Sequence, residues 1–155
     1  MLHIVLVEPE IPQNTGNIAR TVAATGCRLH LVRPLGFSTD DRYLKRAGLD
    51  YWPLVPVSYW DSFPELQAAF PERTFYYATT KGRRKYTDVT YGDGDFLVFG
   101  KETAGLPPEL IRANLAYCIR IPMSAGTRDR SLNLSNAVAV VLYEALRQSG
   151  FAALD

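Results

Sequence analysis

The sequence predicts an α/β fold in which a mostly parallel sheet carries helices on both faces. Two observations predict it: short apolar runs of strand length recur along the chain, and helix-length segments stand between them. Strands that alternate with helices are typical of a parallel sheet covered on both sides. The chain has 155 residues, which suits one domain, so we expect a single domain over 1–155.

The expected elements follow from where the apolar runs begin and end. The run 2–7 predicts a buried first strand, and 14–26 predicts a helix with Asn14 as its N-cap and Gly26 as its stop. Further strands are expected at 29–32, 74–79, 95–100 and 117–122. Further helices are expected over 38–48 with Ser38 or Thr39 as cap, near 61–70, over 106–115 after prolines, and from Leu134 onward.

The composition excludes several classes of protein. Hydrophobic residues make up 47% of the chain and charged residues 21%, which is ordinary for a globular domain and not for a disordered tail. No apolar run is long enough to span a membrane, and the first ten residues lack the basic start and cleavage site of a signal peptide. We therefore expect a cytoplasmic protein.

The sequence predicts no metal site and no disulfide. Cys27 and Cys118 lie far apart and outside any CxxC pattern, so both are expected to be small core residues. His3 and His30 fall in expected strands without a neighbouring ligand pattern. We expect both histidine side chains to be satisfied within the fold.

Basic residues gather in three clusters, although the formal net charge is only +1. A single cluster is more often a solvated face than a phosphate contact, but three of them in expected loops or helix ends favour phosphate contacts. The clusters are Arg42, Lys45 and Arg46; then Lys81, Arg83, Arg84 and Lys85; and finally Arg128 with Arg130.

The first of three unusual loops is EPEIPQNTGNIAR (8–20), at the expected carboxyl end of a strand, where open parallel sheets bind ligands. Asn14 and Gly16 are compatible either with a tight turn and a helix cap or with a ligand site. Arg20 follows among small and apolar helix residues. An arginine in such surroundings usually pairs with a carboxylate or a phosphate.

The second loop is FGKETAGLPPEL (99–110). It is not a Walker A loop, because Leu-Pro follows the second glycine where that motif has Lys and then Ser or Thr. We expect Gly100 to let a ligand approach the backbone and Gly105 to shape the turn. Glu102 is either a carboxylate at a helix entrance or the partner of a buried cation such as Arg20.

The third loop, IPMSAGTRDRSLNLSNA (121–137), leads into an apolar helix. Either Ser131 or Asn133 caps this helix; since one cap suffices, the surplus polar residues indicate a ligand site. The helix carries an apolar stripe of 3.6-residue period, and Ala139 and Val140 extend the apolar surface beyond one face. Such a helix is either fully buried or packed against another subunit, and we expect a homodimer.

Together and in order, the three loops resemble the signature motifs of the SpoU-type branch of the SPOUT RNA methyltransferases. Within that branch, the short chain with EPEIP and GLDYW (48–52) is most similar to the small tRNA wobble-nucleotide 2′-O-methyltransferases. The segment 124–129 is longer than the family's pattern. The matching stretches are NTGNIAR (14–20), FGKETAGLP (99–107), IPM (121–123) and RSLNLSNAVAVVLYE (130–144).

The resemblance implies an S-adenosylmethionine site tied in a C-terminal trefoil knot, in a homodimer that binds the anticodon stem-loop of tRNA. The implied cofactor contacts, mostly through backbone groups, are Ala78, Thr79, Gly100, Ile121, Met123, Ser131 and Leu132. The residues implied to face the RNA and its chemistry are Asn14, Arg20, Glu102 and Asn133.

The implied reaction is in-line transfer of a methyl group from a sulfonium to a ribose 2′-hydroxyl at tRNA position 34, a cytidine or modified uridine. Arginine keeps its proton in proteins, so Arg20 is expected to orient the hydroxyl and the adjacent phosphate and not to act as a base. The basic clusters are expected to contact the tRNA backbone, chiefly Arg42–Arg46 and Lys81–Lys85.

Two alternatives stay open at the level of the sequence. One is 2′-O-methylation of another tRNA or rRNA nucleotide. The other is a non-catalytic RNA- or nucleotide-binding module of the same fold. The joint presence of the four polar residues implied to face the RNA favours an enzyme, because a binding module has no need of that set.

Overall fold

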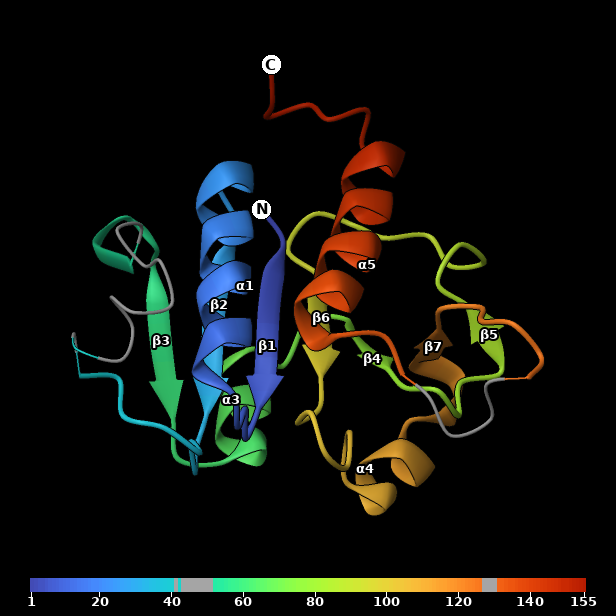
Figure 1. Ribbon diagram of the computed structural model, residues 1–155. Coiled ribbons are helices and arrows are strands. Elements are labelled where there is room, and N and C mark those ends of the chain that lie inside the picture. Colours follow the sequence, from blue (N-terminus) through green and yellow to red (C-terminus); the bar gives the residue numbers. More distant parts are fainter. Residues whose placement is uncertain (41, 43–51, 127–130) are drawn as a thin grey trace.

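The computed structural model describes residues 1–40, 42, 52–126 and 131–155 (Figure 1). Within this part of the chain, one sheet has the strand order β3-β2-β1-β6-β4-β7-β5, and every pairing between neighbouring strands is parallel. This confirms the parallel sheet that the sequence predicts. The strands are β1 (His3–Val7), β2 (Arg28–Val32), β3 (Val57–Trp60), β4 (Phe75–Ala78), β5 (Arg84–Lys85), β6 (Phe96–Phe99) and β7 (Cys118–Arg120).

Helices cover both faces of this sheet, as predicted. Helices α1 and α5 lie on one face and share a core with it, and α3 and α4 pack against the other face. The helices are α1 (Pro12–Thr25), α3 (Phe63–Ala69), α4 (Pro108–Ala113) and α5 (Leu134–Gln148), with single 3₁₀ turns η1 (Trp52–Leu54) and η2 (Leu115–Tyr117). None of the described helices is long and apolar enough to cross a membrane.

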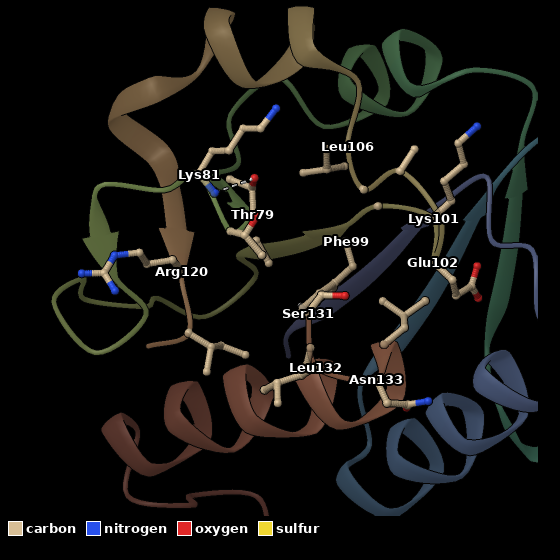
Figure 2. Close-up of a pocket in the computed structure, with 18 of the residues that line it drawn as sticks. Thr79, Lys81, Phe99, Lys101, Glu102, Leu106, Arg120, Ser131, Leu132 and Asn133 are labelled. Atoms are coloured by element: carbon tan, nitrogen blue, oxygen red, sulfur yellow. Dashed lines mark hydrogen bonds between the residues drawn. The ribbon is translucent and has the colours of Figure 1, made fainter. Parts of the chain in front are cut away.

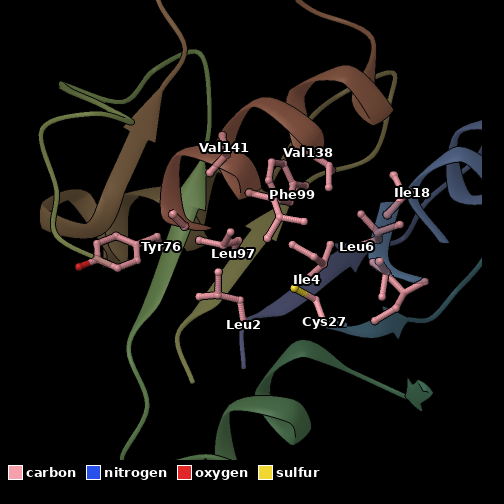
Figure 3. Close-up of a cluster of buried hydrophobic side chains, with 14 of the residues drawn as sticks. Leu2, Ile4, Leu6, Ile18, Cys27, Tyr76, Leu97, Phe99, Val138 and Val141 are labelled. Carbon is pink, nitrogen blue, oxygen red and sulfur yellow. The ribbon is translucent and has the colours of Figure 1, made fainter. Parts of the chain in front are cut away.

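The two cores follow from the alternation of side chains along the strands. On β1, Ile4 and Leu6 belong to the core under α1 and α5, whereas Val5 and Val7 belong to the core under α3 and α4. Figure 3 shows the first core between the sheet and α5. The apolar run at the start of the chain is thus a strand buried on both faces, as expected.

Helix α1 begins two residues earlier than predicted, and Asn14 is not its cap. The N-cap is Ile11, whose side chain caps nothing, and Pro12 occupies the first turn. Asn14 is buried inside that turn. The predicted stop is confirmed, because Gly26 caps the helix in the left-handed conformation at φ 67°.

Helix α5 resolves the alternative left open for its cap. The side chain of Asn133 accepts hydrogen bonds from the backbone N–H groups of Ser135 and Asn136, so Asn133 is the N-cap. Ser131 is exposed upstream of the helix and takes no part in this cap. The predicted apolar stripe is confirmed along the helix, since Val138, Val141 and further members are buried.

The sequence analysis missed two strands. One predicted helix lies almost entirely outside the described residues. Strand β3 follows Pro56 directly, and the two-residue β5 lies inside the basic stretch expected to be a loop. Both are edge strands. The helix expected over 38–48 lies outside the described residues except at its first positions, and so do Lys45, Arg46, Arg128 and Arg130.

The cysteines and histidines behave as expected from the sequence. Cys27 and Cys118 are buried and free. The rings of His3 and His30 bond to each other, with 2.8 Å between His3 Nδ1 and His30 Nε2. Among the described residues, no group of three or more His, Cys, Asp or Glu side chains is arranged to hold a metal ion.

Candidate functional site

A cavity of about 510 Å³ opens at the carboxyl ends of β4, β6 and β7 (Figure 2). Its walls come from the start of α1, from the segments that follow the three strands, and from the start of α5. This is where open parallel sheets place their ligands, because the loops that leave the strands meet there. The three loops singled out in the sequence therefore meet around one space.

Ten of the eleven site residues predicted from the sequence line this cavity. Arg20 does not: it lies exposed on α1, six residues beyond Asn14 and so roughly 9 Å further along the helix axis. The ten lining residues are Asn14, Ala78, Thr79, Gly100, Glu102, Ile121, Met123, Ser131, Leu132 and Asn133.

The loop after β6 folds back tightly on itself at Gly100. A Cβ atom built on Gly100 would lie 2.1 Å from the carbonyl carbon of Gly105 and 2.2 Å from the nitrogen of Leu106. We expected a ligand to lie close to the backbone of Gly100. The group that lies close to it is the backbone of Gly105 and Leu106, from the same loop. Gly105 adopts φ 69°, which confirms that it shapes the turn.

A chain of hydrogen bonds connects the three loops through Glu102, Asn14 and Asn133. The Glu102 carboxylate accepts from the backbone N–H of Glu10 at 2.8 Å, from that of Ile11 at 3.1 Å and from Asn14 Nδ2 at 3.4 Å. Asn14 Oδ1 in turn accepts from Asn133 Nδ2 at 3.0 Å. Glu102 is thus the carboxylate at a helix entrance, which settles the alternative left by the sequence.

The two ends of this chain fix the orientation of both asparagine amides. A carboxylate only accepts and a backbone N–H only donates, so Asn14 turns its nitrogen to Glu102 and Asn133 turns its oxygen to the start of α5. Each amide nitrogen keeps one hydrogen that these bonds do not use. The polar centre of the site therefore offers hydrogen-bond donors, and its carboxylate is occupied.

Glu10 and Thr103 form a second link between the first loop and the loop after β6. One Glu10 oxygen accepts from the Thr103 hydroxyl at 2.7 Å and from its backbone N–H at 3.1 Å. These bonds, together with the positive charge of Lys101, lower the pKa of the Glu10 carboxyl group. The carboxylates of Glu10 and Glu102 thus each bind the opposite loop.

Sequence reasoning did not single out several residues that shape the site. Lys101 and Thr103 stand next to predicted residues inside the second motif, and Glu10 lies in the first loop. Their position beside the predicted motif residues was the only indication in the sequence that they belong to the site. Their roles depend on contacts between loops about 90 residues apart in the chain. Arg120 also lines the cavity, at the end of β7.

Fold and site together define an α/β protein with a cavity beside a set of fixed amide donors at the carboxyl edge of its sheet. Residues 1–143 match the model of the SpoU rRNA Methylase family. The chain is 53% identical over 153 residues to a protein of Escherichia coli named tRNA (cytidine(34)-2'-O)-methyltransferase, covering 97% of this chain and 96% of that protein.

Two solved structures agree with this match. One, described as giving structural insights into the 2-OH methylation of C/U34 on tRNA, has a TM-score of 0.90 at 47% identity and covers 97% of each chain. The other is the SpoU methyltransferase AviRb from Streptomyces viridochromogenes in complex with the cofactor AdoMet, with a TM-score of 0.81 at 27% identity over 96% of this chain and 58% of that chain. The chain belongs to the SpoU rRNA Methylase family and is a methyltransferase.

Proposed function

We propose that the protein transfers a methyl group from S-adenosylmethionine to the ribose 2′-hydroxyl at position 34 of tRNA, in the cytoplasm. The observation that carries the proposal is the meeting of three loops around one cavity, with the amides of Asn14 and Asn133 held in fixed orientation. The Escherichia coli relative's name supports the choice of nucleotide.

The cavity suits this cofactor in size and chemistry. Its volume of about 510 Å³ lies in the usual range for cofactor sites, and Phe99, Leu106 and Ile119 supply apolar walls beside backbone polar groups. S-adenosylmethionine supplies an activated methyl group when bound. The residues that would hold it are Ala78, Thr79, Gly100, Ile121, Met123, Ser131 and Leu132.

The chain's own polar groups orient the acceptor and do not deprotonate it. The unused hydrogen on Asn133 Nδ2 can donate to the ribose oxygen, and Glu102 is occupied by backbone amides. Holding two reacting atoms in line supplies much of the acceleration for an already activated donor. The proton of the hydroxyl therefore leaves to an acceptor outside this set, such as a phosphate of the RNA.

Arg20 would orient the hydroxyl and its neighbouring phosphate from outside the described cavity. It is an exposed cation on the same helix as Asn14, and a guanidinium matches the geometry of a phosphate. Replacement of Arg20 by alanine is expected to slow methyl transfer while cofactor affinity stays the same. Normal turnover in this variant would remove Arg20 from the reaction.

Basic side chains near the site would bind the tRNA backbone. Lys81 and Arg83 lie exposed just before the edge strand β5, and Lys85 lies exposed on it, paired with the end of β7. Arg84 differs from them, because its guanidinium donates to the backbone oxygens of Ala116 and Asp88 and so braces the fold. RNA affinity that does not change with salt would contradict a role in phosphate binding.

We infer that the protein is a homodimer that uses helix α5. Val140 and Tyr143 are exposed apolar residues on one face of α5, between Asn136 and Arg147. An apolar surface that continues along one exposed helix face is typical of an interface between proteins. Sedimentation equilibrium should give a dimer for the wild type and a monomer for Tyr143→Glu. A wild-type monomer would contradict the inference.

We propose that 1–155 folds as one domain and that its C-terminal part is knotted. Helices α1 and α5, from opposite ends of the chain, lie side by side on one core (Figure 1). One cooperative calorimetric transition is expected, and two separate transitions would contradict a single domain. Covalent closure of the termini should trap the knot, so that the denatured circle is more compact than an unknotted circle of equal length.

The direct test of the function is incubation with labelled S-adenosylmethionine and total RNA, tRNA and ribosomal RNA included, from cells that lack this gene. Label is expected in tRNA, at nucleotide 34, resistant to alkaline cleavage because the 2′-hydroxyl is methylated. Label in ribosomal RNA alone would contradict tRNA as the substrate and would identify ribosomal RNA in its place. The absence of label from any RNA would favour a binding module.

A further inference from the structure

Two lysines from different loops line the cavity. Lys81 follows β4 and Lys101 follows β6, and both line the cavity. In Figure 2 their side chains extend toward the same side of the site, with Leu106 between them. An incoming strand of RNA would therefore meet two positive charges that come from two different loops.

Neither ammonium group is neutralised by a contact within the part of the chain that the structure describes. The ion pairs found there join Met1 to Asp93, Arg33 to Asp61 and Arg147 to Glu144. The hydrogen bonds that these two residues make within this part of the chain use backbone groups: Lys81 N–H donates to the Thr79 hydroxyl, and the Lys101 carbonyl accepts from Gly105. Both ammonium groups are therefore available to a ligand.

The carboxylate next to Lys101 in the chain and the carboxylate that feels its charge are both held in other contacts. Glu102 binds the entrance of α1, and Glu10 binds Thr103. The charge of Lys101 contributes to the lowered pKa of the Glu10 carboxyl group, so the two groups feel each other's field without forming an ion pair within 4 Å. Lys101 is half-buried, and it lines the cavity.

We propose that Lys101 and Lys81 form a two-point phosphate clamp, in which each ammonium group binds a different phosphate of the RNA strand beside the nucleotide that enters the cavity. The proposal rests on RNA as the substrate under the proposed function. Lysine suits this task because its ammonium is a point charge that binds phosphate in any orientation. The clamp fixes the register of the strand and reads no base.

The test measures RNA binding against salt for a matched set of variants. The probe is a fluorescent tRNA anticodon stem-loop without modification at position 34, titrated between about 50 and 200 mM salt. Lys101→Met and Lys81→Met each remove one charge and keep an unbranched side chain that is one atom shorter. Lys101→Arg restores the charge. Arg28→Met is the control, because it removes an exposed cation from the amino end of β2, at the opposite edge of the sheet.

Each Lys→Met change is expected to lower the slope of log affinity against log salt by about 0.7 to 0.9, which is roughly a threefold change over this salt range. The double variant should lose about twice as much slope as either single variant. Lys101→Arg and Arg28→Met should keep the wild-type slope. The affinity for S-adenosylmethionine alone, measured by calorimetry, should stay unchanged in all five variants.

Several results would overturn the clamp. An unchanged slope in Lys101→Met removes this residue from RNA binding, and a double variant no weaker than the singles means that both lysines share one phosphate. Weaker cofactor binding would assign the lysines to the cofactor carboxylate. Methyl transfer is measured separately, so wild-type protein that binds the stem-loop through both lysines but does not methylate it overturns the proposed function and not the clamp. Wild-type protein that does not bind RNA overturns both.

Discussion

At the scale of single residues, the site depends on which way two amide groups face. Glu102 at one end and the backbone N–H groups of α5 at the other leave Asn14 and Asn133 one consistent orientation. An asparagine held in this way presents a donor to the ligand. The same Asn133 side chain also caps α5, so it has a structural and a functional role that substitution can separate.

Asn133→Asp is expected to separate these two roles. Aspartate caps a helix as well as asparagine does, so the temperature of unfolding should fall only by what the lost bond to the buried Asn14 contributes. The new carboxylate faces Asn14 Oδ1 without a hydrogen to donate, so methyl transfer should slow by about a hundredfold or more, the usual effect of losing one oriented donor. Single-turnover kinetics and thermal unfolding measure the two effects.

Asn133→Ala is the control for this prediction, because it removes both the cap and the donor. It should slow methyl transfer and also lower stability, by about 1 kcal/mol for the lost cap. If Asn133→Asp turned over at the wild-type rate, the donor orientation derived from the hydrogen bonds would be irrelevant to the reaction.

The sequence predicted the helix cap that lies next to its helix in the chain, and it missed the cap that comes from a distant part of the chain. Asn133 lies two and three residues before the amides it caps, which a sequence pattern can reveal. The entrance of α1 is capped instead by Glu102, which is 92 positions from Glu10. No local pattern carries that contact, so Asn14 was taken for the cap although Pro12 already marked the first turn.

At the scale of elements, the loop after β6 depends on a glycine with no room for a side chain. In Gly100→Ala the new Cβ would meet backbone atoms of Gly105 and Leu106, which cannot rotate away. The loop must shift, so we expect a loss of about 1–3 kcal/mol in the free energy of unfolding and a marked loss of cofactor affinity. Denaturant unfolding and calorimetric titration with S-adenosylmethionine measure both.

Gly126→Ala, in the segment that follows β7, is the control for this substitution. A Cβ atom on Gly126 meets nothing within 4 Å, so this variant should keep wild-type stability and cofactor affinity. Equal cofactor binding by Gly100→Ala and the wild type would contradict the tight reversal of the chain that forms one wall of the site.

The predicted elements differ from the observed ones mainly at the edges of the sheet. Buried strands such as β1 and β6 are continuous apolar runs, which sequence patterns identify well. The missed strands β3 and β5 are edge strands, with mixed or charged side chains and a partner on one side only. Their pairing is a property of the assembled sheet.

At the scale of the whole molecule, a hydrogen-bonded chain of rings crosses three strands away from the site. The indole N–H of Trp60 on β3 donates to His30 Nδ1 at 3.0 Å, and His30 Nε2 lies 2.8 Å from His3 Nδ1. An indole only donates, so the proton of neutral His30 is on Nε2 and is donated to His3. The bonds require both imidazoles to stay neutral.

This chain predicts that stability falls with acid. Burial lowers the pKa of His3 to about 4 and that of His30 to about 3, from an ordinary value of 6.5. Below pH 6.5 the unfolded chain therefore binds protons that the folded protein does not. The contribution of the two histidines to the free energy of unfolding is complete above pH 6.5. It decreases as the pH falls toward their pKa values in the folded protein. Thermal unfolding at pH 7.5, 6.5, 5.5 and 5 measures it.

His30→Gln is the matched variant for this pH dependence. Glutamine can accept from Trp60 and donate to His3, but it does not titrate. Its unfolding temperature should therefore fall less steeply than that of the wild type between pH 6.5 and 5. Parallel curves for the two proteins would contradict the assignment of neutral histidines.

The fold class and most of the site were predictable because they depend on patterns within short stretches. Buried runs predicted the parallel sheet, and the three loops contain eight of the ten predicted residues that line the cavity, while Ala78 and Thr79 come from the end of β4. The position of Arg20 outside the cavity and the role of Glu10 depend on how distant segments pack, which short stretches do not encode. The identity of the ligand was inferred from the resemblance to a family and not from periodicity.

The central claim is best tested with two anticodon stem-loops that differ in one oxygen. One carries ribose at position 34 and the other carries 2′-deoxyribose there, and each is incubated with the protein and labelled S-adenosylmethionine. We predict one methyl group on the ribose of nucleotide 34 in the first stem-loop, located by mass spectrometry, and none in the second. Equal labelling of both, or labelling at another nucleotide, would contradict the proposed reaction.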